Sequence, residues 1–198
     1  MDNKVMRNIS YGLFILTAKD GDKLNGCVTN TLQQVTTTPN RVTITVNKDN
    51  LTHDMVLKTK QFNVSILSEK SKFDTFKHFG FQSGRDMDKF ADYPHALAEN
   101  GLPYIIEGAN GYISADVIGT VDLGSHTLFI ADVTDGNVIE DIPSATYDYY
   151  HKNIKESPDK KSGGWVCTIC GYVHPHEDLQ DDFVCPLCKH PASDFKKL

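Results

Sequence analysis

Trp165-Val-Cys-Thr-Ile-Cys-Gly-Tyr172 and Phe183-Val-Cys-Pro-Leu-Cys188 are the two stretches that determine how the end of this chain folds. Each contains a Cys-x-x-Cys pair, and a spacer of 14 residues, 171–184, separates the two pairs. Pairs at this spacing can form two tight loops that present four thiolates in a tetrahedron, as zinc and iron sites require. The predicted metal ligands are Cys167, Cys170, Cys185 and Cys188.

The identity of the metal does not follow from this spacing, because four thiolates suit both iron and zinc. Aromatic residues flank the pairs and are expected to form a dry shell that tunes a redox metal, although they would also serve as the core of a zinc ribbon. A segment this short cannot build a self-sufficient core, so metal binding and folding are expected to be one event. Gly171 stands where the loop must turn back, which favours positive φ. The aromatic residues are Trp165, Tyr172, Phe183 and Phe195.

The larger, N-terminal part of the chain alternates apolar and polar residues in short runs, which predicts β-strands. The clearest runs are 12–18, 41–46, 62–66, 113–121 and 127–133. Many strands with few helices between them favour an antiparallel barrel. We therefore expect a mainly β fold, followed by a small metal domain.

Helices and turns are expected between these strands. Thr52 is expected to cap a helix that runs to about Lys60. The Asp-Gly pairs at 20–21 and 135–136 predict turns. A further helix would place three phenylalanines on one side, namely Phe73, Phe76 and Phe79.

The chain changes character near residue 152, where strand patterns give way to the polar sequence KNIKESPDKKSGG. The proline, the charges and the two final glycines of this sequence are typical of a linker. We expect a barrel domain at 1–151, a linker at 152–163 and a metal domain at 164–198.

The composition argues against several classes of function. A net charge of −6 without a basic block argues against nucleic acid as a partner. No apolar run approaches the roughly 20 residues that a membrane helix needs, and the first residues do not form a signal peptide, so we expect no membrane association and a cytoplasmic location. Cys27, the fifth cysteine, is expected to be a small buried residue rather than a catalytic thiol.

The residues around the four cysteines resemble a rubredoxin, in the short-spacer form found at the end of rubrerythrins. The resemblance rests on WVCTICGYVH at 165–174 and CPLCKHPASDF at 185–195. It implies one iron ion, Fe2+ or Fe3+, held by the four thiolates. The spacer is shorter than in free-standing rubredoxins. Because four thiolates already close the site, three histidines are expected to be exposed polar residues, namely His174, His176 and His190.

The N-terminal part contains neither a Gly-x-Gly-x-x-Gly fingerprint nor a phosphate-binding Walker loop. Polar clusters interleave with its strands instead. One of them has the features of an anion site, because Lys48 provides charge while Asn50 and Thr52 provide short donors at the start of a helix. The plainer interpretation is a surface turn with a helix cap.

Several segments, in the same order, resemble the flavin reductase-like family of FMN-binding split β-barrels, and together they cover about 7–155. Segment 26–36 resembles the one that lines the isoalloxazine, 47–53 the one that holds the FMN phosphate, and 79–90 a loop that borders the flavin. The FMN-binding residues that the resemblance implies are Thr29, Asn30, Thr31, Gln34, Val35, Thr36, Asn47, Lys48, Asn50, Thr52, Ser83 and Lys89.

Gly124-Ser125-His126 resembles the Gly-Asp-His motif of the same family, which implies that His126 positions the nicotinamide. Ser125 replaces the acid of that motif. If the acid orients the histidine, we expect the imidazole of His126 to be less fixed in this chain.

The two domains together resemble the high-molecular-weight rubredoxins. This resemblance implies an NAD(P)H-dependent oxidoreductase that passes electrons from NADH through FMN to the iron, and on to a partner such as a flavodiiron protein that reduces nitric oxide or oxygen. Split-barrel flavin reductases are usually homodimers, so a homodimer is implied as well. Two alternatives stay open: a flavin reductase with a structural zinc ribbon, and an FMN and iron electron carrier without a nicotinamide site.

Overall fold

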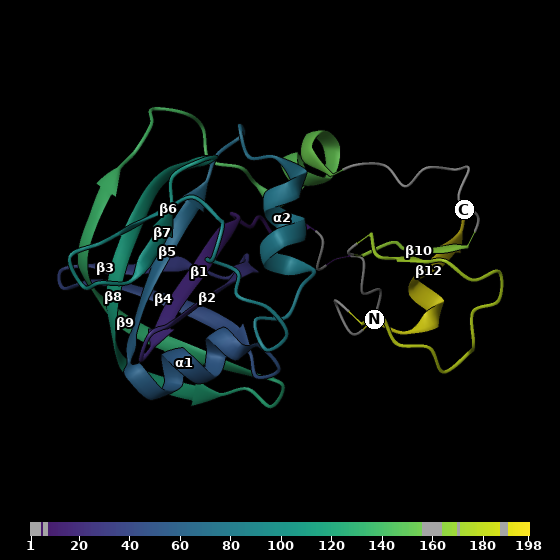
Figure 1. Ribbon diagram of the computed structural model, residues 1–198, viewed down its shortest axis with the longest axis horizontal. Coiled ribbons are helices and arrows are strands. Elements are labelled where there is room, and N and C mark those ends of the chain that lie inside the picture. Colours follow the sequence, from purple (N-terminus) through teal and green to yellow (C-terminus); the bar gives the residue numbers. More distant parts are fainter. Residues whose placement is uncertain (1–4, 6–7, 156–163, 170, 187–189) are drawn as a thin grey trace. The chain divides into compact units, whose positions relative to one another are not determined.

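The computed structural model describes residues 5, 8–155, 164–169, 171–186 and 190–198. The chain divides into two compact units, Met1–Ile154 and Lys155–Leu198 (Figure 1). Within the described ranges, no helix is both long and apolar enough to cross a membrane.

The first unit is built on a seven-stranded antiparallel sheet, in the order β2-β1-β5-β8-β9-β4-β3 (Figure 1). Its strands are β1 (Phe14–Asp20), β2 (Lys23–Thr29), β3 (Gln33–Thr37), β4 (Asn40–Asn47), β5 (Gln61–Leu67), β8 (Ala109–Asp122) and β9 (His126–Val138). The unit also contains β6 (His95–Leu97), β7 (Pro103–Ile105), α1 (Leu51–Thr59), α2 (Phe73–Gly80), α3 (Tyr147–Tyr149) and a π-helical turn at Tyr150–Ile154.

The predicted strands agree closely with this sheet. The runs 41–46, 62–66, 113–121 and 127–133 lie within β4, β5, β8 and β9. The first strand begins at Phe14 rather than at Gly12, because Gly12 forms an isolated bridge with Thr146. The prediction of a mainly β fold is confirmed.

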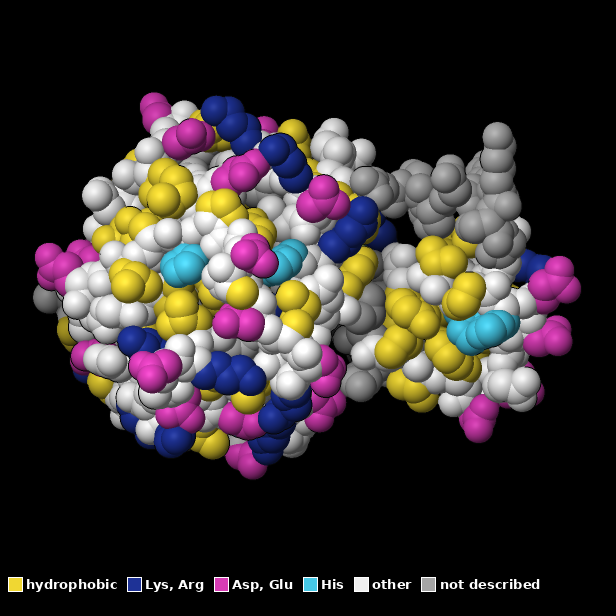
Figure 2. Space-filling model, in the orientation of Figure 1, with side chains coloured by type: hydrophobic (Ala, Val, Ile, Leu, Met, Phe, Trp, Pro, Cys, Tyr) yellow, Lys and Arg dark blue, Asp and Glu magenta, His cyan; other side chains and the backbone are white. Residues whose placement is uncertain are grey.

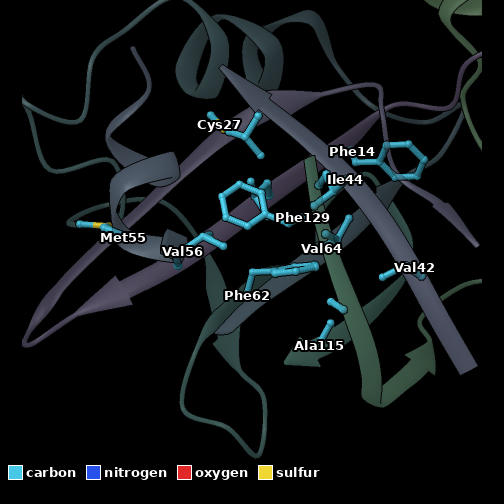
Figure 3. Close-up of a cluster of buried hydrophobic side chains, with 14 residues drawn as sticks. Phe14, Cys27, Val42, Ile44, Met55, Val56, Phe62, Val64, Ala115 and Phe129 are labelled. Atoms are coloured by element: carbon cyan, nitrogen blue, oxygen red, sulfur yellow. The ribbon is translucent and has the colours of Figure 1, made fainter. Parts of the chain in front are cut away.

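Period-two alternation in β1 divides the apolar residues between the two faces of the sheet. Phe14 and Leu16 join one core, whereas Leu13 and Ile15 join the other. Figure 3 shows part of the first core, where Phe62, Val64 and Phe129 meet between the strands and Met55 and Val56 approach from α1. This core forms because β1, β2, β4, β5, β8 and β9 all direct apolar side chains to the same side.

The second core lies beneath α2 and the segment that follows it. Phe76 and Phe79 are buried, and Phe73 is half-buried against the same cluster, so the predicted one-sided spacing is confirmed. Phe90 and Ile105 complete this layer from outside the helix.

Three local predictions are corrected by the structure. Helix α1 begins at Leu51 with Asn50 as its N-cap, so Thr52 is not the cap. The second Asp-Gly pair lies inside β9 and makes no turn there. At Gly136 a Cβ would come within 2.8 Å of the Tyr112 carbonyl oxygen, so the glycine permits a close approach of strands beside a bulge. The π-helical turn Tyr150–Ile154 extends into the predicted linker, of which 156–163 lies outside the described residues.

The surface of the first unit carries many exposed ion pairs. Lys58 pairs with Asp20 at 2.7 Å, and Lys72 pairs with Glu107 at 2.6 Å. Figure 2 shows acidic and basic side chains interspersed over the visible face of this unit, with apolar side chains between them. Such exposed pairs contribute little stability, so the two apolar cores hold this unit together.

The second unit is a three-stranded sheet in the order β11-β10-β12. Its elements are β10 (Trp165–Cys167), β11 (Val173–His174), β12 (Phe195–Lys197) and a 3₁₀ turn at Ala192–Asp194. Its buried cluster contains Cys167, Cys185 and Phe195. The cysteines therefore occupy the position that apolar side chains occupy in the first unit.

Candidate functional site

The end of the β8–β9 hairpin lies against the turn between β4 and α1. Asn47 and His126 are register partners at the end of the β4–β9 ladder. The Lys48 amide donates to the Ser125 carbonyl at 3.0 Å, and the Asp49 amide donates to Oδ1 of Asn47 at 2.9 Å. Two segments that the sequence separates by nearly 80 residues, both with predicted site residues, are thus brought together.

Asp122 completes this corner and was not predicted from the sequence. Its Oδ1 accepts from Nζ of Lys48 at 2.7 Å and from the Gly124 amide at 2.8 Å. The hydrogen bond from Lys48 and then that from Gly124 hold the pKa of the Asp122 carboxyl below its usual value. The charge of Lys48 is consequently shared with a carboxylate.

Ser125 is a partner for the imidazole of His126, although it replaces the acid of the motif. Its Oγ lies 2.8 Å from Nδ1 of His126. A hydroxyl at this distance forms a hydrogen bond, so the ring has a partner although the acid of the motif is absent. That the ring is less fixed than it would be with an acid stays a prediction.

The start of α1 fits a phosphate. Asn50 is the N-cap, but its side chain makes no capping hydrogen bond. The first N–H groups of a helix lack partners within the helix and carry the positive end of its dipole, which favours an anion. Lys48 precedes this helix and is only partly exposed, with its side chain 36% accessible.

The crossing from β2 to β3 is anchored on β4. Oγ1 of Thr31 donates to the Thr45 carbonyl at 2.7 Å and accepts from the Thr45 amide at 3.0 Å. Oγ1 of Thr29 lies 3.0 Å from the same hydroxyl. Asn30 lies between them and is half-buried. Three predicted site residues therefore lie close to Thr45, two residues before the end of β4.

Gln34, Val35 and Thr36 lie on β3, an exposed edge strand. Gln34 donates through Nε2 to Oδ1 of Asn40 at 2.8 Å, and the Thr36 hydroxyl donates to the Pro39 carbonyl. Gln34 is register partner of Val42, five residues from Asn47 along β4. At about 3.3 Å per residue this corresponds to roughly 17 Å.

Two predicted ligands are directed into the protein instead. Thr52 is fully buried, and its hydroxyl accepts from Nδ2 of Asn25 at 3.0 Å. Lys89 is 3% exposed, and its Nζ donates to the carbonyls of Gly26 and Phe79, both at 2.9 Å. Both side chains, which are predicted FMN contacts, thus have partners inside the protein. Their burial depends on tertiary packing, which the local sequence does not encode.

Lys89 and Cys27 share this interior region. Burial lowers the pKa of Lys89, an effect that the nearby Cys27 partly offsets. Burial also raises the pKa of the Cys27 thiol, against a hydrogen bond from Thr52 and the charge of Lys89. Cys27 is 6% exposed, so the prediction of a small buried residue is confirmed.

Loop 81–90 is attached to the rest of the unit at several points. Ser83 is exposed, and its Oγ accepts from the Arg85 amide at 3.1 Å. Gly84 lies so close to Asn25 that an added Cβ would be 2.0 Å from Oδ1 of that residue, which explains why glycine is needed there. Lys89 supplies the buried attachment at the other end of the loop.

A polar chain links this loop to α1 and β9. Arg85 pairs with Oδ2 of Asp54 at 2.8 Å, and Oδ1 of Asp54 lies 3.1 Å from Nδ1 of His53. Nε2 of His53 lies 2.8 Å from Oγ1 of Thr127, the residue after His126. Arg85, and then His53, hold the pKa of the Asp54 carboxyl below its usual value. This polar chain ends beside the candidate site. His53 and Arg85 lie in the segments 47–53 and 79–90 that resemble flavin-binding segments, but the sequence predicts no role for any residue of the polar chain.

The structure describes two of the four predicted ligands of the metal centre. Cys167 and Cys185 are completely buried, while Cys170 and Cys188 lie outside the described residues. The Cys167 amide donates to the Tyr172 carbonyl at 2.8 Å, and the Cys185 amide donates to the His190 carbonyl at 2.8 Å. In both turns the bond joins a cysteine to the residue five positions later, so the two turns are equivalent in this respect.

The shell around these cysteines is apolar. Ring centroids lie 5.3 Å apart for Phe183 and Phe195 and 6.5 Å apart for Tyr172 and Phe195, and Trp165 packs against the same cluster. Figure 2 shows hydrophobic side chains gathered on the visible face of this unit. Gly171 has a φ of 80°, as predicted for the turn. Thiolates in an apolar shell are the donor set that a four-cysteine metal site requires.

The predicted exposure of the three histidines of this unit is only partly confirmed. His176 is exposed, whereas His174 is half-buried and lies 4.5 Å from the Phe183 ring. His190 is also half-buried, with Nδ1 2.8 Å from Oδ2 of Asp194.

Comparison with known families agrees with both units. The model of the Flavin reductase like domain matches residues 6–158, and that of the Rubrerythrin, rubredoxin-like domain matches 165–196. Among solved structures, the NADH:FAD oxidoreductase SgcE6 of Streptomyces globisporus C-1027 matches with a TM-score of 0.66 and 24% identity, over 72% of this chain and 84% of that one. This likeness shows the fold alone.

Two relatives are more similar in sequence. The High molecular weight rubredoxin of Moorella thermoacetica is 35% identical over 229 aligned positions, which cover all of both chains. The Ferric-chelate reductase (NAD(P)H) of Archaeoglobus fulgidus is 32% identical over 151 residues, which cover 76% of this chain and 89% of that protein. The chain therefore belongs to the flavin reductase-like family, in the form that carries a C-terminal rubredoxin-like domain.

Proposed function

We propose that this protein is an NAD(P)H-dependent oxidoreductase that passes electrons from NADH through FMN to an iron centre and on to a redox partner, such as a flavodiiron protein that reduces nitric oxide or oxygen. When bound, the flavin supplies hydride acceptance and the iron supplies one-electron transfer. One observation carries the proposal: a helix start suited to a phosphate and a pair of buried cysteine turns of rubredoxin type occur in one chain.

The residues that would hold the FMN phosphate are Asn47, Lys48 and Asn50, together with the first N–H groups of α1. The isoalloxazine would be held by Thr29–Thr31 and Gln34–Thr36. A flavin mononucleotide carries its ring system and its phosphate at opposite ends, so it needs a site with two separated ends. Asn47 ends β4, whereas Gln34 on β3 pairs with Val42 of β4, five residues away, which supports this assignment.

His126 is proposed to position the nicotinamide. It lies at the start of β9, half-buried, beside the turn that carries Lys48. Asp122 reduces the net positive charge of this corner through its bond to Lys48. An anion other than the FMN phosphate would therefore be attracted to this corner less strongly than to an unpaired lysine.

Iron is proposed at Cys167, Cys170, Cys185 and Cys188. The aromatic shell and the match to a rubredoxin-like domain favour iron over zinc. Of these four cysteines, the two that the structure describes, Cys167 and Cys185, are completely buried, which would keep water from the metal.

We also propose that the protein is a cytoplasmic homodimer. The hairpin of β8 and β9 exposes several large apolar side chains near its end: Ile118 is 49% exposed, Val121 44% and Leu123 53%. Apolar side chains gathered at one exposed place favour contact with a second copy.

The test is a visible spectrum with metal analysis, followed by anaerobic titration with NADH. We expect one iron per chain and a red colour that fades only after the flavin is reduced. Stoichiometric zinc without colour would instead indicate a flavin reductase with a structural zinc site. A flavin that NADH does not bleach would indicate an electron carrier without a nicotinamide site.

A full-length Cys167→Ser variant tests the order of the centres. It should still oxidise NADH with free electron acceptors but should lose electron transfer to a flavodiiron protein, because the metal site is incomplete. Cys27→Ala removes a buried cysteine of the first unit and should leave both activities intact. Full transfer by Cys167→Ser would contradict the scheme.

A further inference from the structure

Ser125 and His126 form a hydrogen-bonded pair at the end of the β8–β9 hairpin. The distance from Oγ of Ser125 to Nδ1 of His126 is 2.8 Å. Neutral imidazole has one nitrogen that donates and one that accepts, and a hydroxyl can serve either. A carboxylate in place of Ser125 could only accept, and would require a hydrogen on Nδ1.

The backbone that carries this pair is fixed from both sides. The Leu123 amide donates to the His126 carbonyl at 2.9 Å, and the Ser125 carbonyl accepts from the Lys48 amide at 3.0 Å. Asp122 accepts from the Gly124 amide at 2.8 Å. Gly124 has a φ of 83°, which the tight connection requires. The two side chains on this backbone are joined by their mutual hydrogen bond.

The charged groups around the pair are themselves engaged. Asp122 is bonded to Lys48, and Asp49 follows Lys48 in the adjoining turn. On the other face of β9, His53 and Asp54 form a pair directed to Thr127. Among the contacts of the described residues, none joins a carboxylate to the His126 ring, and Ser125 is the partner of Nδ1.

We propose that Ser125 is a positioning residue that donates its hydroxyl hydrogen to Nδ1 of His126, and so places the hydrogen of the neutral imidazole on Nε2. Nε2–H is then a donor for an uncharged carbonyl, the group that the carboxamide of a nicotinamide offers. The inference rests on the proposed function for the identity of that carbonyl, but the tautomer is a property of the protein alone.

The direct test is NMR of the full-length protein without flavin, labelled with ¹⁵N-histidine and measured at alkaline pH. The chain contains eight histidines, and His126→Gln identifies the signal of His126 by its loss. We expect the Nε2-protonated form in the natural protein and in Ser125→Thr. Ser125→Ala should give a mixture of tautomers, and Ser125→Asp should move the hydrogen to Nδ1.

Kinetics of NADH oxidation by the flavin-loaded protein provide a second readout. Ser125→Ala should lower kcat/KM for NADH by about threefold to tenfold, the range that one hydrogen bond provides, and Ser125→Thr should restore it. Thr120→Ala removes an exposed hydroxyl from the same hairpin and should change neither measurement.

The outcomes separate this inference from the proposed function. A natural protein with the hydrogen on Nδ1, or an Ser125→Ala ring identical to the natural one, would overturn the inference even if NADH is oxidised. A protein that does not oxidise NADH would contradict the proposed function, while the NMR result would still decide the role of Ser125.

Discussion

The two units are stabilised in opposite ways. The first buries apolar side chains in two clusters, one on each face of its sheet, contributed by nearly every strand and by α1 and α2. The described part of the second buries Cys167, Cys185 and Phe195 in a single small cluster. A core of this size cannot offset the entropy of folding, so we expect the second unit to depend on a bound metal. Many buried side chains thus stabilise the first unit, whereas the second is expected to depend on one small cluster and its metal.

The candidate sites differ in the same sense. The proposed flavin site collects side chains from the β2–β3 crossing, the β4–α1 turn and the β8–β9 hairpin, which the sheet brings together. The proposed metal site is made by two short turns, each closed by its own backbone hydrogen bond. The second site is local in sequence and the first is not.

Loss of the metal should have the largest effect. Cys185→Ser should abolish metal binding and unfold 164–198, because a bound structural metal contributes on the order of 10 kcal/mol in domains of this kind. The measurement is metal content together with amide hydrogen exchange in both units. Residues 8–155 should keep their protection, as should the whole of a Cys27→Ala control, which loses about 1 kcal/mol. Protected amides in 164–198 without metal would refute the contrast between the units.

Replacement of a buried polar group in the first unit should have an intermediate effect. Lys89→Met leaves the carbonyls of Gly26 and Phe79 without their donor, which should lower the free energy of unfolding by about 2 kcal/mol near neutral pH. Chemical denaturation measures this change. Lys58→Met, at an exposed lysine, should change the free energy of unfolding little. A loss of cooperative folding would show that this unit, too, depends on a single group.

The pH dependence of Lys89→Met has a defined sign. Because burial lowers the pKa of Lys89 in the folded state, the unfolded chain binds more protons between that lowered pKa and the ordinary value of 10.5. Stability of the natural protein should therefore rise with pH across this window, relative to the variant. Some tyrosines, whose pKa values are raised, also affect stability in this pH range, but they are the same in both proteins. The difference in the free energy of unfolding between the natural protein and Lys89→Met therefore reports on Lys89. A difference that does not change with pH would contradict the assignment.

Loss of a surface ion pair should have the smallest effect. Arg85 and Asp54 are each about half exposed, so Arg85→Ala should cost less than about 1 kcal/mol. The pair holds the pKa of Asp54 below its ordinary value of 3.8, so its contribution is present above that value and is lost as pH falls through the lowered pKa. Thermal unfolding from neutral to acid pH measures both effects.

The matched control for Arg85→Ala is Lys58→Ala, which breaks an exposed pair at the other end of α1. Only Arg85→Ala should also speed amide exchange in loop 81–90, because Arg85 attaches that loop to α1. Equal exchange in both variants would show that Lys89 alone holds the loop.

Sequence patterns predicted the strands well, because period-two alternation is a direct consequence of one face being buried. They do not reveal burial that depends on distant partners. Thr52 carries a short hydroxyl at a helix start, which predicts a cap, but Asn25 on β2 donates to it inside the protein. Lys89 is a predicted FMN contact, and nothing in its sequence neighbourhood indicates that its ammonium lies between two backbone carbonyls.

The sequence by itself predicted two cysteine turns at the end of the chain, because two Cys-x-x-Cys pairs at this spacing are typical of a four-thiolate metal site. It also determined the mainly β character of the first unit. Only the tertiary structure decided that Asp122 shares the charge of Lys48 and that Ser125 lies within hydrogen-bond distance of His126. The first contact joins residues 74 positions apart, and side-chain pairing over such a separation leaves no periodic signal in the sequence. The second joins neighbouring residues, but it depends on the backbone conformation of the hairpin end, which the hydrogen bond from the Lys48 amide to the Ser125 carbonyl helps to set.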